Sequence, residues 1–247
     1  MIKVLRDIIS RNHAGERAAI PSVCSAQPDV LRASLIMAER LDRHIVIEAT
    51  SNQVNQDGGY TGMTPAGFIS FVNGLADDAD VARERIIFGG DHLGPQAWRS
   101  LDANTALAKA DIMVRDYVAA GFDKIHLDCS EGCAGEAAQL SDAQTAARSA
   151  RLARICCDTH DDLMFVVGTE VPPPGGARMD EDADISPTAP TAARCWRMMR
   201  RLVIWRGLSG DWSSSRVWNS ARQPCITCRL IVIRSCAPHL PTIPTSA

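Results

Sequence analysis

The chain has 247 residues, of which 46% are hydrophobic and 22% are charged, a balance that excludes a disordered polymer and a fibre. No apolar run approaches the ~18 residues that a membrane span needs, and the charged start MIKVLRDIISRNHAGE lacks the apolar core of a signal peptide. Nine cysteines, an odd number, do not suit a fully paired secreted framework. We therefore expect a cytoplasmic protein with a packed core and no contact with membranes.

The formal net charge of -3 conceals two segments of opposite charge. Residues 194–247 contain nine arginines, no lysine and one acid, for a net charge of +8, so residues 1–193 carry -11. We divide the chain into a first domain, residues 1–193, and an aberrant basic tail, residues 194–247. Arginine interleaved with tryptophan is the one argument for nucleic-acid binding by the tail. We expect no nucleic-acid partner, because a change of reading frame also yields this composition.

Short apolar runs alternate with longer amphipathic segments along residues 1–193. A helix is expected after Pro28, a second after the cap residue Thr64, and a third that ends at Gly121. A fourth helix begins with the capping box of Ser141 and Gln144. The short runs predict five strands, at Ala19–Cys24, His44–Glu48, Arg85–Gly89, Lys124–Asp128 and Met164–Gly168.

This alternation predicts an α/β fold with a parallel sheet. The five strands correspond to about five βα units of a (β/α)8 TIM-barrel type of fold, which is incomplete at that number. A doubly wound sheet is the competing architecture. It lacks sequence support, because no G-x-G-x-x-G follows the first strand and no phosphate-binding P-loop occurs in the chain.

Polar side chains follow the predicted strands at the end where a barrel assembles its active site. A set of imidazole and carboxylate groups can bind a divalent metal such as Zn²⁺, which polarises a sugar carbonyl. The same groups could instead cap helices or hold loops together. The candidate catalytic residues are Glu48, Asp91, His92, His126, Asp128 and Glu170.

Amide side chains and glycines near the strand ends are candidate substrate-binding groups. The amides can bind sugar hydroxyls, and the glycines let backbone N–H groups approach a phosphate. Both have a structural alternative, because amides also join loops together and tight turns need glycine. A structural salt bridge is expected for Lys124. The substrate-binding candidates are Asn52, Gln53, Asn55, Gln56, Gly89, Gly90, Gly175 and Gly176.

Four segments together resemble the GatZ/KbaZ family: IEATSNQVNQDGGYTGMTP, RIIFGGDHLGPQAW, YVAAGFDKIHLDCSEGCA and VVGTEVPPPGGA. The resemblance covers about residues 1–193 and implies a barrel-type fold and a cytoplasmic setting. It also implies a non-catalytic subunit that supports the stability and activity of class II D-tagatose-1,6-bisphosphate aldolase in galactitol or N-acetylgalactosamine catabolism. The implied partners are a catalytic aldolase subunit of the GatY/KbaY type and a phosphorylated ketohexose.

Two alternative functions stay open. In the first, the protein acts alone as a metal-dependent ketohexose-phosphate 4-epimerase or aldolase, and the resemblance implies His92, His126 and Glu170 as metal ligands, with Glu48 as a further metal or acid–base candidate. In the second, the chain is a non-functional fragment. The label of tagatose 6-phosphate kinase, also used in the family, has no support here, because the sequence shows neither a P-loop nor the kinase motifs.

The resemblance ends near Ala193, whereas family chains continue through the remaining barrel strands. One choice of codons for SSRVWNSA, residues 214–221, contains VEPGVEF in another frame, which is similar to a family segment at the sixth strand. We therefore predict that the chain after about residue 193 is translated out of frame. A barrel stopped after five strands has exposed edges and marginal stability. Sequencing the gene across the codons for residues 183–211 tests the frame change.

Overall fold

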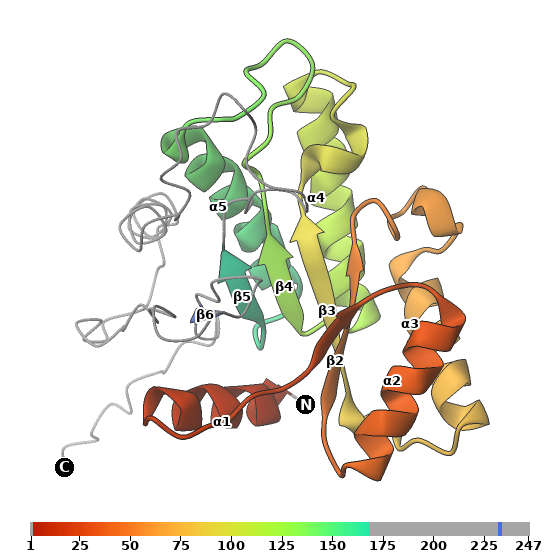
Figure 1. Ribbon diagram of the computed structural model, residues 1–247. Coiled ribbons are helices and arrows are strands. Elements are labelled where there is room, and N and C mark those ends of the chain that lie inside the picture. The colour runs from red at the N-terminus through yellow and green to blue at the C-terminus, as the bar shows by residue number, and fades with distance from the viewer. Residues whose placement is uncertain (1, 168–231, 234–247) are drawn as a thin grey trace, which may run out of the picture.

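A parallel sheet of five strands in sequential order forms the framework of the protein (Figure 1). The computed structural model describes residues 2–167 and 232–233. Neighbouring strands from β1 to β5 are parallel, and the two-residue strand β6 is antiparallel to β5. The strands are β1 Ser22–Cys24, β2 Ile45–Thr50, β3 Ile86–Leu93, β4 Lys124–Leu127, β5 Met164–Val167 and β6 Val232–Ile233.

The sequential strand order confirms the predicted α/β fold and distinguishes it from a doubly wound sheet. A doubly wound sheet reverses its strand order at a switch point, and no reversal occurs among the described strands. Five parallel strands in chain order, each joined to the next by a crossover that contains a helix, are the arrangement of a (β/α)8 barrel over its first units. Each observed strand overlaps its predicted run, and β2 and β3 extend further than predicted, to Thr50 and Leu93.

The helices that follow the first four strands cover one face of the sheet (Figure 1). Their ends carry the predicted capping residues. The Thr64 hydroxyl accepts a hydrogen bond from the backbone N–H of Gly67, and Ser141 and Gln144 form the capping box. Gly121 ends its helix in the left-handed conformation, with φ of 107°. The helices are α2 Pro28–Arg40, α3 Pro65–Asp78, α4 Ala103–Ala120 and α5 Asp142–Thr159, with 3-10 turns η1 Gly59–Thr61, η2 Arg83–Arg85 and η3 Pro95–Trp98.

Helix α1, Ile2–His13, is not among the predicted elements. It lies across the amino ends of the strands (Figure 1). Ile2 and Leu5, which share one face of the helix at a spacing of three residues, are buried there. They form a second apolar cluster with side chains from the starts of β2, β3 and β5, namely Val46, Ile87 and Met164.

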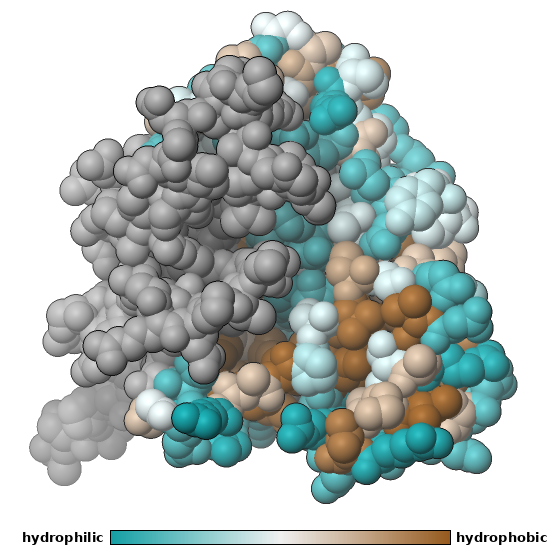
Figure 2. All heavy atoms as spheres, viewed as in Figure 1, coloured by the Kyte–Doolittle hydropathy of each residue, from teal (hydrophilic) through white to brown (hydrophobic). Residues whose placement is uncertain are grey.

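Side chains of each strand alternate between the helix-covered face and an inner face. On β2, Ile45, Ile47 and Ala49 belong to the main core beneath the helices, whereas Val46 and Glu48 lie on the inner face. The inner face is apolar at the amino ends of the strands, where α1 covers it, and charged closer to their carboxyl ends. In the part that lies beside the grey atoms, Figure 2 shows hydrophobic groups toward the amino ends of the strands and hydrophilic groups beyond them. This alternation gathers polar side chains of neighbouring strands at one end of the inner face.

Several predictions fall outside the described residues. They concern the site candidates Glu170, Gly175 and Gly176, and the basic tail 194–247 apart from the two residues of β6. The division into two domains and the frame change therefore stay predictions. Among the described helices, none has both the length and the apolar character needed to cross a membrane.

Candidate metal centre

A β-bulge brings two consecutive side chains of β3 to the inner face. The pairing of β3 with β4 shifts between Gly90 and Leu93, where β3 has one residue more than its partner. Inside this interval His92 has φ of 47°, in the left-handed region that non-glycine residues seldom adopt. In a regular strand Asp91 and His92 would point to opposite faces. Because of the bulge, both lie against His126 of β4.

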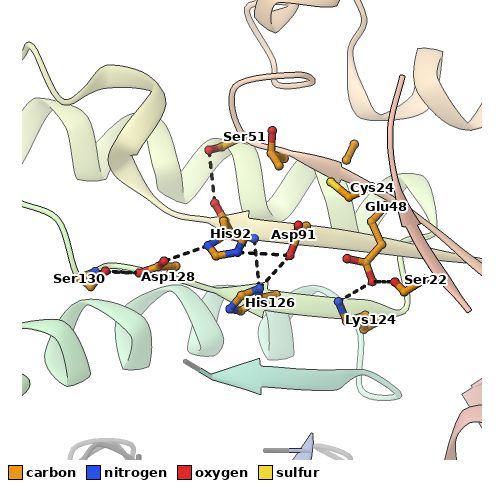
Figure 3. A network of polar contacts seen from close by, with 12 residues as sticks. Ser22, Cys24, Glu48, Ser51, Asp91, His92, Lys124, His126, Asp128 and Ser130 are labelled. Carbon is orange, nitrogen blue, oxygen red and sulfur yellow. Dashed lines mark hydrogen bonds and ion pairs between the residues drawn. The ribbon is translucent and has the colours of Figure 1, made fainter. Parts of the chain in front are cut away.

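Asp91, His92 and His126 form a compact cluster of candidate metal ligands (Figure 3). One ligand atom from each residue lies within 4.8 Å of the others. His126 Nδ1 is 2.9 Å from Asp91 Oδ1, and the two imidazole ring centroids are 4.3 Å apart. Two imidazoles and one carboxylate are a donor set of catalytic zinc sites, which keep a further position for water or substrate. These side chains therefore fit a divalent metal such as Zn²⁺.

Asp128, which directly follows β4, orients His92. It is fully buried, its Oδ2 lies 3.0 Å from His92 Nδ1, and its Oδ1 accepts hydrogen bonds from the backbone N–H and the hydroxyl of Ser130. Burial raises the pKa of Asp128, but the bonds from His92 and Ser130 outweigh burial and hold this pKa below its usual range. An ionised Asp128 accepts a hydrogen bond from Nδ1–H, which leaves the lone pair of His92 on Nε2. Carboxylates orient metal-binding histidines in this way.

Asp91 is also held in its charged form. Burial raises its pKa, but the hydrogen bond from His126 and the charges of His92 and Lys124 hold the pKa of Asp91 well below its usual range. A general base works best when its pKa is near the operating pH. A carboxylate that stays ionised suits a metal ligand better, so Asp91 fits the ligand set. Of the three predicted ligands, His92 and His126 meet in the cluster, and Glu170 lies outside the described residues.

A buried ion pair, Glu48 with Lys124, lies next to the cluster on the side of the strand amino ends (Figure 3). The two residues stand on β2 and β4, and Lys124 Nζ donates to Glu48 Oε1 at 2.6 Å across Gly89 of β3. A Cβ on Gly89 would lie 3.0 Å from Glu48 Cγ and 3.2 Å from Lys124 Cδ, so glycine leaves the space for the pair. Ser22 of β1 donates to the same Glu48 oxygen at 2.5 Å. The predicted salt bridge of Lys124 is confirmed.

The predicted amide residues lie in the loop after β2, where three of the four bond to the protein itself. Asn55 makes three hydrogen bonds to the backbone of its own loop. Gln53 accepts from the backbone N–H of Thr50, and Gln56 donates to a backbone carbonyl of α4. Asn52 is exposed. These contacts are of the loop-joining kind, and a substrate-binding role for the four amides stays a prediction.

The two predicted glycines of β3 face opposite sides of the sheet. Gly89 lies on the inner face beneath the ion pair. Gly90 lies toward the helices, where a Cβ would be 2.4 Å from Leu93 Cδ1 and 3.2 Å from Tyr117 Cδ1. Gly90 therefore leaves room for Leu93, which is fully buried next to the bulge. Approach of a phosphate to either glycine stays a prediction.

Three serines that the sequence did not single out bond to residues of the site. Ser22 and Ser130 donate to Glu48 and Asp128, and Ser51 donates to the backbone carbonyl of His92 at 3.3 Å. For Ser130 a local signal existed, because an aspartate commonly accepts a bond from the backbone two residues onward. The other two contacts depend on strand pairing.

Comparison with known proteins agrees with this fold. The family model described as D-tagatose-1,6-bisphosphate aldolase subunit GatZ/KbaZ-like matches residues 5–226. The chain belongs to the GatZ/KbaZ-like family. It is therefore a tagatose-bisphosphate aldolase-related protein, and the resemblance found in the sequence is confirmed. The match continues past residue 193, where the resemblance was expected to end.

Two relatives of this GatZ/KbaZ-like chain carry different names. A D-tagatose 6-phosphate 4-epimerase from Agrobacterium fabrum (strain C58) is 49% identical over 215 residues, which are 85% of this chain and 50% of the relative. A crystal structure of a probable tagatose 6 phosphate kinase from Sinorhizobium meliloti 1021 is 46% identical with a TM-score of 0.66, and the match covers 74% of this chain and 44% of that protein. The chain thus spans about half the length of the curated relative that it matches.

Proposed function

We propose that this chain carries the metal-binding part of a divalent-metal-dependent ketohexose 6-phosphate 4-epimerase, which interconverts D-tagatose 6-phosphate and D-fructose 6-phosphate. The observation that carries the proposal is the cluster of Asp91, His92 and His126, which a β-bulge assembles at the carboxyl-end side of the inner face. The name of the 49% identical relative supplies the substrate. Membership of an aldolase-related family supports the type of chemistry.

Inversion at C4 of a ketose needs more than exchange of a hydrogen, because the C4 hydrogen is not next to the C2 carbonyl and is not acidic. In a retro-aldol route the C4 hydroxyl loses its proton, the C3–C4 bond breaks, and the electron pair of that bond moves toward the C2 carbonyl oxygen. The C4 aldehyde turns, C3 attacks its other face, and the proton returns to the C4 oxygen. A divalent metal bound by the cluster would polarise the C2 carbonyl.

The described residues suit binding and orientation in this reaction. His92 and His126 present imidazole nitrogens, Asp91 adds a permanent negative charge, and Asp128 fixes the ring of His92. Both aspartates have lowered pKa values and are weak bases. We therefore assign proton transfer at the C4 hydroxyl to Glu170, the catalytic candidate that follows the fifth strand in the sequence.

Turnover of D-tagatose 6-phosphate, measured by a coupled assay for D-fructose 6-phosphate, tests this function. After treatment with a chelator, activity should return only with a divalent metal. His126→Ala should lose metal binding and at least about 100-fold in turnover, because removal of a direct ligand exceeds the 10–100-fold effect of an outer partner. Glu170→Gln should lose turnover and keep the metal, because this proposal takes Asp91, His92 and His126 as the ligands and Glu170 as the proton-transfer group.

A matched control is Lys109→Met, since Lys109 pairs with Asp57 at 2.8 Å outside the cluster. This variant should keep both metal binding and turnover. Turnover that needs no metal, or a His126→Ala variant with full activity, would contradict the proposed function.

The family description favours a second proposal, in which the chain supports a separate catalytic aldolase subunit in galactitol or N-acetylgalactosamine catabolism in the cytoplasm. This role needs no metal in the chain itself. The half-life of a class II tagatose-bisphosphate aldolase should rise when the chain is added, equally for the wild type and for His126→Ala. An unchanged half-life of the aldolase would contradict this second proposal.

A further inference from the structure

We infer that the Glu48–Lys124 pair binds the C1 hydroxyl end of the sugar, and that it selects a ketohexose 6-phosphate over a ketohexose 1,6-bisphosphate. The inference rests on the proposed function, because it takes the metal cluster as the site of the C2 carbonyl. It adds a substrate-binding role for two residues that are outside the ligand set. Lys124 in particular was expected to have a structural role alone.

The position of the pair fits a substrate that begins at the metal cluster. Figure 3 shows Glu48 and Lys124 reaching toward one another beside Asp91. Lys124 is near enough to Asp91 for its charge to contribute to the lowered pKa of that carboxyl. The pair stands closer to the strand amino ends than the cluster does. A ketose with its C2 carbonyl at the cluster therefore has C1 near the pair, and its longer C3–C6 part extends toward the strand carboxyl ends.

The pair has hydrogen-bonding capacity that the described residues leave unused. Lys124 Nζ has three N–H donors, and Glu48 Oε1 is the acceptor that it meets in the described part of the chain. Glu48 Oε1 accepts from both Lys124 and Ser22, whereas no hydrogen bond to Glu48 Oε2 comes from residues 2–167 or 232–233. A donor and an acceptor side by side match a hydroxyl group, which accepts and donates at once.

The net charge of the pair determines whether it favours a hydroxyl or a phosphate at C1 of the sugar. The side chains of Glu48 and Lys124 are 5% and 12% exposed, so water screens their charges poorly. Their charges cancel, and the pair offers no net attraction for an anion. A phosphate on C1 would meet the Glu48 carboxylate at short range and would lose its own hydration. A neutral hydroxyl meets neither cost, so the pair favours the 6-monophosphate.

Isothermal titration calorimetry of the full chain with Zn²⁺ present tests the inference, with D-fructose 6-phosphate and D-fructose 1,6-bisphosphate as the two ligands. The wild type should bind the monophosphate at least about 10-fold more tightly than the bisphosphate. A ratio of dissociation constants of about 10-fold is the size of effect that one hydrogen bond to a charged group provides. Glu48→Gln leaves a net positive charge and should shift the preference toward the bisphosphate. Lys124→Met leaves a net negative charge and should lower the affinity for both ligands, with the larger loss for the bisphosphate. Lys109→Met, the control, should change neither dissociation constant.

A double variant, Glu48→Gln with Lys124→Met, tests the inference if a single variant fails to fold. It leaves no buried charge unpaired and should therefore fold. The wild type should prefer D-fructose 6-phosphate to its 1-deoxy analogue by about 10-fold, and the double variant should bind the two equally. Equal wild-type affinity for the mono- and bisphosphate, or a double variant that still prefers the 1-hydroxyl sugar, overturns this inference alone. A wild type that binds no ketohexose phosphate overturns the proposed function and this inference with it.

Discussion

Removal of Lys124 should destabilise the fold far more than removal of a lysine from an exposed ion pair. In Lys124→Met, Glu48 keeps one hydrogen bond, from Ser22, and loses its counter-charge while its side chain is 5% exposed. An uncompensated buried charge costs about 3–5 kcal/mol, a large part of the ~5–15 kcal/mol that holds a domain folded. The comparison is Lys109, whose pair with Asp57 is 2.8 Å long with side chains 35% and 51% exposed. Lys109→Met should cost about 0–1 kcal/mol.

Urea unfolding followed by far-ultraviolet circular dichroism measures these costs in a double-mutant cycle. The double variant Glu48→Gln with Lys124→Met leaves no charge buried alone, so its free energy of unfolding should lie close to that of the wild type. The coupling energy between the two positions should then be about 3 kcal/mol or more, at the upper end of the range for contacting residues. Equal costs for Lys124→Met and Lys109→Met, or additive effects within the buried pair, would refute the reasoning, because water would then screen both pairs alike.

Three further predictions concern the surroundings of the metal cluster. Asp128→Asn should lower metal affinity about 10–100-fold, because the ionised partner that orients His92 is lost; titration with Co²⁺ followed by its absorption measures this, and an unchanged affinity would limit Asp128 to holding its loop. Tyr117→Phe should cost about 1 kcal/mol in urea unfolding, because the buried Tyr117 hydroxyl donates to the Val54 carbonyl at 2.9 Å; a variant as stable as the wild type would show that this bond has no net value. Gly94→Ala should cost about 3 kcal/mol or more, because its Cβ would lie 1.8 Å from the Asp128 carbonyl oxygen; wild-type stability in the same assay would contradict that geometry.

The helices and strands of this chain could be predicted because their signals are local. Thr64, the capping box of Ser141 and Gln144, and Gly121 mark helix ends by bonds that form within a few residues, and all of them act as predicted. Helix α1 also had a local signal, the spacing of its apolar residues along one face, which was not used to predict it. The ends of the strands were predicted less accurately. The final residues of β3 belong to a bulge, and the bulge depends on pairing with β4, which is distant in the sequence.

The candidate site could be predicted in its composition and only partly in its geometry. Residues near the carboxyl ends of parallel strands meet at one edge of a sheet, so the grouping of Asp91 with His126 follows from fold class. Strict alternation would have placed either Asp91 or His92 on the inner face, and the bulge places both there. The contact of Glu48 with Lys124 joins strands that are not neighbours, and it depends on the exact register of three strands. For that reason a salt bridge of Lys124 could be predicted, whereas its partner could not.

Strand β3 builds both parts of the site by two opposite means. At Gly89 it supplies no side chain, and charges from the strands on either side meet over the gap. Two residues later it supplies one side chain more to the inner face than a regular strand would. The bulge places His92 in the left-handed region, which costs about 1–3 kcal/mol of backbone strain. The contacts of His92 with Ser51 and Asp128, each worth about 1 kcal/mol, offset that strain. Loss of the Asp128 contact should therefore act on the metal site through the backbone of the bulge as well as through the imidazole ring.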